Sequence, residues 1–211
     1  LFNIMRGGTF DDQYEIETAD FLLHIKQMNM QDYQRLKPVL KALPDQISYH
    51  QLRHFLVASK HKHTMRYYLE YLPLSFSRRH GAPSRPCNHF SIETKDEYGK
   101  KLRNFEGNWR DIFQNWEALA FSYPEFALGM VAKFVNASTI DGYNPYRISR
   151  DGIDWEIVEP SDPWSHIGYW GDHQVIYLCK LLEISLNYQP ERLKTMLSNK
   201  IFTYANVPYK I

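Results

Sequence analysis

Apolar residues recur at helical spacing through the first third of the chain. Residues 12–29 place apolar side chains three or four positions apart, with acidic residues early in the segment, so we predict a helix there. A second helix is predicted over residues 31–43, and Pro44 ends it. Ser48 is well placed as the N-cap of a third helix that reaches about residue 59.

The second half of the chain repeats the helical pattern with longer connections. Residues 109–121 carry a clear stripe of period 3.6, and Pro124 is well placed to open the next helix. Residues 170–186 predict another long helix, and Pro190 begins a short final one. Between them, residues 141–167 are rich in Gly, Pro, Asp and Trp and lack helical period, which is typical of a functional loop. We therefore predict an all-α fold of helical hairpins with long loops at one end.

Composition divides the chain into two regions. All five Trp residues fall within residues 109–170, and residues 77–86 carry the Gly, Pro and Ser of a connecting loop. We predict a helical N-terminal or linker region over 1–100 and a second domain over 101–211.

Charge and apolar content exclude several classes of protein. The 25 Lys and Arg nearly balance the 24 Asp and Glu, giving a formal charge of +1, so we expect no nucleic acid as a partner. No apolar run approaches the length of a membrane helix, so no membrane partner is expected. Two Cys are too few for a disulfide framework and favour a reducing, cytoplasmic compartment.

Three short motifs combine charged and aromatic residues at places where a pocket forms easily. Two predicted helix starts, near residues 109 and 170, and one turn near 141 carry Asp, polar and aromatic side chains together. Sugars offer hydroxyl groups to bidentate polar side chains and C–H faces to aromatic rings, so this combination indicates a carbohydrate subsite. The predicted substrate-binding residues are Trp109, Arg110, Asp111, Gln114, Glu117, Asp141, Tyr143, Trp170, Asp172 and His173.

At these residues the sequence resembles the (α/α)-toroid, or six-hairpin, glycosidases, especially the cellobiose and cellodextrin phosphorylase branch. The resemblance covers about residues 105–190 and rests on Trp109-Arg110-Asp111 with Gln114, on Asp141-Gly142, and on Gly171-Asp172-His173. It implies that Arg110, Asp111 and Asp172 bind the sugar where the glycosidic bond breaks. Gly171 stands where the branch has an aspartate, so one sugar-binding carboxylate is missing.

Hairpin counting predicts that the chain holds only part of such a toroid. A helical hairpin takes roughly 35 to 50 residues, so residues 101–211 supply about two of the six. In the family, the general acid lies on a later hairpin, in an Asp-containing motif with a neighbouring Trp. No such motif follows residue 174 in this sequence. We therefore expect part of a glycoside phosphorylase or hydrolase, with a longer parent chain supplying the rest and the catalytic residues unidentified.

The expected partner is an oligosaccharide or glycoside. No cofactor or metal is expected, apart from inorganic phosphate as the co-substrate of a phosphorylase. His50 and His54 have the spacing of a metal pair but lack a third ligand with motif spacing. The alternative is a non-enzymatic protein-interaction module, in which the basic residues between 35 and 66 dock an acidic partner and the Trp residues form a core or interface.

Overall fold

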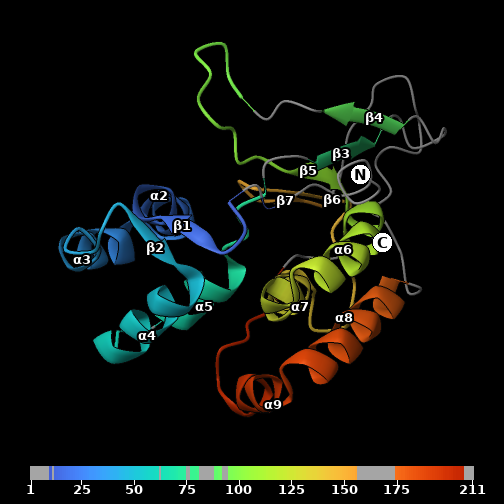
Figure 1. Ribbon diagram of the computed structural model, residues 1–211. Helices are drawn as coiled ribbons and strands as arrows, with labels where there is room; N and C mark the ends of the chain where they lie inside the picture. Colours follow the sequence, from blue (N-terminus) through green and yellow to red (C-terminus); the bar gives the residue numbers. More distant parts are fainter. Residues whose placement is uncertain are drawn as a thin grey trace.

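The structure of the chain is a computed structural model that describes residues 10, 12–61, 63–74, 77–80, 88–91, 95–155 and 174–206. In these ranges the fold is mostly helical, with short antiparallel strands (Figure 1). The α-helices are α2 (Thr18–Met28), α3 (Met30–Leu40), α4 (Tyr49–Ser59), α5 (Thr64–Glu70), α6 (Trp109–Ser122), α7 (Ala127–Ala137), α8 (Val175–Tyr188) and α9 (Pro190–Ser198). None of them has the length and hydrophobicity needed to cross a bilayer.

The strands form three small sheets among the described residues. Their bounds are β1 (Glu15–Glu17), β2 (Gln46–Ser48), β3 (Ser77–His80), β4 (Asn88–Ser91), β5 (Glu106–Asn108), β6 (Arg147–Ser149) and β7 (Ile153–Asp154). β1 pairs with β2, β3 pairs with β4, and β5, β6 and β7 form a sheet in that order, all antiparallel. The mostly helical class is confirmed, whereas a toroid is not shown and stays a prediction.

Helix boundaries follow the predicted capping chemistry closely. The Ser48 hydroxyl accepts a hydrogen bond from the Gln51 N–H at 3.2 Å, and the Ser48 N–H donates to Gln51 Oε1 at 3.3 Å. This capping box satisfies two N–H groups that the start of α4 would otherwise leave without partners. Pro124 opens a 3-10 turn, η1 (Pro124–Phe126), that continues into α7, and Pro190 opens α9, as predicted.

The helix predicted from residue 12 begins only at Thr18. Residues 15–17 form β1 instead, with Ile16 opposite Ile47 of β2. Both isoleucines are buried, and the exposed Glu15 precedes Ile16 in an alternation that suits a strand. The predicted long loop 141–167 likewise contains two strands: β6 pairs with β5, the strand leading into α6, and β7 pairs with β6.

One hydrophobic core runs through both halves of the chain. Phe10 stacks on Phe126 of η1 with ring centroids 4.0 Å apart, and Tyr49 of α4 lies 4.7 Å from the same ring. Tyr49 also stacks on Tyr68 of α5 at 4.2 Å. Aromatic rings from the N-terminal helices therefore pack directly on the segment between α6 and α7.

Helices α5 and α7 approach each other so closely that a glycine is needed. A Cβ added to Gly129 of α7 would lie 2.3 Å from the carbonyl oxygen of Leu69 in α5. Alanine is normally the better residue inside a helix. At this position the clash requires the two helices to separate, so the usual preference reverses.

We expect Gly129→Ala to lower the free energy of unfolding by about 1 to 3 kcal/mol, the usual range for overpacking. Urea denaturation measures the change. Gly152→Ala is the matched control, because a Cβ there meets nothing within 4 Å. A Gly129→Ala variant as stable as the wild type would show that α5 and α7 are not tightly packed.

His24 of α2 is buried in the same core. Its ring lies 5.4 Å from that of Tyr71 and 6.3 Å from that of Phe21, and its Nε2 has no hydrogen-bond partner. Burial, together with the nearby cations Lys133 and Arg150, lowers the pKa of His24 from 6.5 to about 3. The folded chain therefore keeps this imidazole neutral.

A lowered histidine pKa makes the fold less stable as the pH falls. As the pH falls below 6.5, His24 binds a proton in the unfolded chain but stays neutral in the folded chain. The free energy of unfolding is therefore highest above pH 6.5 and decreases below it. We expect His24 to account for a loss of about 2 kcal/mol between pH 7 and pH 5. Urea denaturation at the two pH values should show this loss in the wild type and in the control His54→Gln, which changes an exposed residue. An equal loss in His24→Gln would contradict the assignment.

Candidate functional site

The start of α6 is held in place by the sheet that precedes it. The Trp109 N–H donates to the Tyr146 carbonyl oxygen at 2.9 Å. The Trp109 ring is fully buried and lies 4.5 Å from Phe113 and 5.2 Å from Phe134. Trp116 is equally buried. Both indoles therefore belong to the hydrophobic core in this structure.

The polar residues of α6 lie in different environments. Asp111 is buried and forms an ion pair with the half-exposed Arg110, whose Nε lies 3.8 Å from Asp111 Oδ1. Gln114 is exposed. Glu117 accepts a hydrogen bond at 2.9 Å from Lys180 of α8, and this contact ties the two helices together.

The second predicted motif lies on a turn at residues 139–143. The Gly142 N–H donates to the Thr139 carbonyl at 3.0 Å, and Gly142 has φ +87°, which glycine adopts without strain. Asp141 and Tyr143 are exposed on this turn. Three residues after Tyr143, the Tyr146 carbonyl oxygen accepts the hydrogen bond from the Trp109 N–H, which connects this part of the chain to the start of α6.

The third predicted motif precedes helix α8 in the sequence. Trp170, Asp172 and His173 lie outside the described residues. Gln174, directly before α8, is fully buried. Helix α6 packs on α8, and both helices start on the right-hand side of the view in Figure 1. The two helix starts are therefore at the same end of the helix pair.

Several buried polar groups along α6 and directly before α8 have no hydrogen-bond partner in the described part of the chain. They are the Nε1 atoms of Trp109 and Trp116, Nδ2 of Asn115, and both amide atoms of Gln174. Buried polar groups in native proteins nearly always find a partner, so these atoms retain unused hydrogen-bonding capacity. The described residues hold no cluster of three or more metal-ligating side chains, and His50 lies 3.8 Å from Glu125.

A second polar cluster, which we call the Arg103 network, joins the two halves of the chain. Its members are Asp12, Glu17, Asp20, Tyr71, Lys101, Arg103 and Arg150. The Arg103 side chain is only 7% exposed. It donates two hydrogen bonds to Glu17, at 2.7 and 3.0 Å, and one to Asp12 at 2.8 Å.

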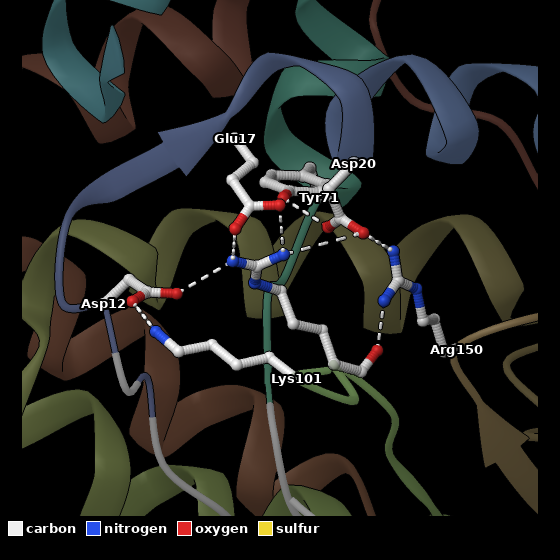
Figure 2. Close-up of polar contacts among 7 residues, drawn as sticks. Asp12, Glu17, Asp20, Tyr71, Lys101 and Arg150 are labelled. Carbon is white, nitrogen blue, oxygen red and sulfur yellow. Dashed lines mark hydrogen bonds and ion pairs between the residues drawn. The ribbon is translucent and has the colours of Figure 1, made fainter. Parts of the chain in front are cut away.

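Figure 2 shows how the remaining members close the network. The Tyr71 hydroxyl donates to Asp20 Oδ2 at 2.6 Å, and Arg150 donates to Asp20 Oδ1 at 2.6 Å. Arg150 also donates to the Arg103 carbonyl oxygen, and Lys101 pairs with Asp12. The acids and the tyrosine lie within residues 12–71, whereas the three cations lie within residues 101–150.

Burial and the hydrogen bonds of the network change the pKa values of several of its members. The hydrogen bonds from Arg103 lower the pKa of Glu17 below its ordinary value. Burial alone would raise the pKa of Asp12, but the hydrogen bonds from Lys101 and Arg103 outweigh burial and lower it. Burial raises the pKa of Tyr71. Carboxylates with lowered pKa values stay ionised at neutral pH, so they suit a structural role in ion pairs better than a role in proton transfer.

Sequence reasoning missed the Arg103 network because its partners are distant in the chain. Arg103 and Glu17 are 86 residues apart, and Arg150 and Asp20 are 130 apart. No motif or spacing connects residues at such separations. The only available signal was the early run of acids in residues 11–20, which we interpreted as favouring a helix start.

Comparison with protein families places a known domain type in the first half of the chain. Residues 10–73 match the family described as glycoside hydrolase family 149 insertion domain 1. The matched segment contains α2 to α5 and the acidic members of the Arg103 network. It lies outside residues 105–190, on which the toroid resemblance rests, and it shows neither a toroid nor a phosphorylase branch. A search of curated proteins found no match.

We expect Arg103→Met to lower the free energy of unfolding by about 2 to 4 kcal/mol, because it leaves partly buried carboxylates without their cation. Lys101→Met is the control, since its exposed ion pair is worth about 1 kcal/mol or less. Urea denaturation at pH 7 compares the two variants. Equal losses would show that Arg103 is no more important than a surface residue.

Proposed function

We propose that the chain is part of a carbohydrate-active enzyme of the glycoside hydrolase family 149 type. The observation that carries this proposal is the match of residues 10–73 to an insertion domain of that family. The Arg103 network and the shared aromatic core attach this segment to the helices that bear the predicted sugar site. The segment and the site therefore belong to one folded structure.

In this proposal the sugar subsite lies where α6 and α8 begin. Asp111 and Arg110 present a carboxylate and a guanidinium group, which form the strong, directional hydrogen bonds that sugar hydroxyl groups accept and donate. Asp141 and Tyr143 are exposed on the adjoining turn. Gln174 adds a buried amide with unused hydrogen-bonding capacity.

The other predicted members complete the subsite as part of the proposal. Gln114 is exposed on α6, and Glu117 is held by Lys180. Trp170, Asp172 and His173 come from the undescribed segment before α8. The buried Trp109 supports the subsite from the core side rather than as an exposed stacking platform.

The reaction is the breaking of a glycosidic bond by water or by inorganic phosphate. Both routes need a general acid to protonate the leaving oxygen and a nucleophile on the sugar carbon. We assign the general acid to further residues of a longer parent chain. The described residues thus supply substrate binding, and inorganic phosphate is the co-substrate if the bond is broken by phosphorolysis.

A protein-interaction module is the second candidate. Complete burial of Trp109 and Trp116 favours it, because these indoles then have a purely structural role. Exposed Arg35, Lys41 and Lys60 would form the face that docks an acidic partner. Binding to such a partner would weaken as salt rises, whereas binding of a neutral oligosaccharide would not.

We expect Asp111→Asn to weaken oligosaccharide binding by about tenfold or more, because it removes a charge-assisted hydrogen bond while keeping the side-chain shape. Tryptophan fluorescence and calorimetry, with a panel of α- and β-linked gluco-oligosaccharides, measure the affinity. The same substitution in the parent chain should reduce cleavage.

Glu183→Gln is the control for this experiment, because Glu183 is exposed on α8. Circular dichroism verifies that both variants fold. The proposal fails if neither the chain nor its parent binds any sugar in the panel, or if Asp111→Asn binds as tightly as the wild type.

A further inference from the structure

A hollow of about 480 Å³ lies on the matched segment, separate from the proposed sugar subsite. It is formed by the start of α3 and by the connection between α4 and α5, and its basic lining residues are Arg35, Lys60, His61 and His63. Figure 1 shows α3 and α4 on the opposite side of the view from the start of α6. The hollow therefore has no part in the sugar subsite.

The basic groups around the hollow are largely without acidic partners. Lys60, His61 and His63 are exposed, and no carboxylate in the described part of the chain forms an ion pair with them. The one acid in the lining, Asp32, accepts a hydrogen bond from the Tyr67 hydroxyl at 2.5 Å. It lies 3.7 Å from Arg35, so it neutralises only part of the local positive charge.

The backbone holds these side chains in a defined arrangement. Lys60 and His63 have φ values of 53° and 67°, the left-handed conformation that non-glycine residues seldom adopt. The Thr64 hydroxyl donates to the His61 carbonyl at 3.0 Å. Across the hollow, Asn29 caps α3 by accepting from the N–H groups of Gln31 and Asp32 at 2.9 and 3.1 Å. Both rims are therefore ordered by local hydrogen bonds.

We propose that this hollow binds a small molecule carrying a phosphate group. The guanidinium of Arg35, the ammonium of Lys60 and the ring N–H groups of His61 and His63 are the donors that bind phosphate oxygens. The described lining includes no Trp, Tyr or Phe, so it offers no platform for stacking on a neutral sugar. Its volume lies in the range of ligand pockets and exceeds the needs of free phosphate, which favours a phosphate monoester.

The test compares ligand binding by the wild-type chain and by a variant with Arg35→Gln, Lys60→Asn and His63→Asn. Asparagine is chosen because it tolerates the left-handed backbone at both positions. Calorimetry with inorganic phosphate and with hexose 1-phosphate, at matched ionic strength, should show binding that is at least about tenfold weaker in the variant. Lys194→Gln changes an exposed basic residue of α9 outside the hollow, and this variant should bind like the wild type.

The two ligands distinguish the sources of the phosphate group. Tighter binding of hexose 1-phosphate would assign the hollow to a phosphate monoester, and binding of inorganic phosphate alone would assign it to the free anion. In the wild type, NMR should place the ligand-induced shifts on the imidazoles of His61 and His63, which keeps the test valid if the triple variant fails to fold. Equal affinities in variant and wild type, or no binding of either ligand, would overturn the proposal.

Discussion

The guanidinium group of Arg103 is buried between the two halves of the chain and is neutralised by acids that lie more than 80 residues away. Taking the guanidinium group of Arg103 and the largely buried carboxylate of Asp20 out of water costs several kcal/mol per ion unless their partners are in place. The network is therefore stable only when residues 12–20, Tyr71 and residues 101–150 are assembled together. This requirement makes the matched segment an integral part of the fold.

The site depends on the same assembly. Arg103 lies two residues before Phe105, a core residue that packs on Trp116, and β5 and α6 follow directly. On the other side, α7 packs on α5 so closely that only glycine fits at residue 129. The matched segment thus packs on α7 and, through Arg103, holds the chain that leads into α6. A substitution in residues 10–73 can therefore change the position of α6 without contacting it.

Local chemistry made much of the fold predictable. The Ser48 cap, the apolar stripe from Trp109 to Phe121 and the prolines at 124 and 190 all act within a few residues of chain, and the structure confirms the helices they predict. The strands were missed because a pair such as Ile16 and Ile47 is defined by a partner 31 residues away. For the candidate site, the sequence predicted only which residue types gather in three short motifs, and not the surroundings of each side chain. The sequence could not show that Trp109 is buried in the core, that Glu117 pairs with Lys180, or that Arg103 has three acidic neighbours.

Native-state hydrogen exchange tests the central claim, that the matched segment and the site-bearing helices are one cooperative structure. Amides in α2 and α5 and amides in α6 and α7 should open with the same free energy, equal to that of global unfolding. They should also lose protection together as denaturant is added. If α2 and α5 instead open at a clearly lower free energy while α6 and α7 stay protected, the segment is an independent module and the account is wrong.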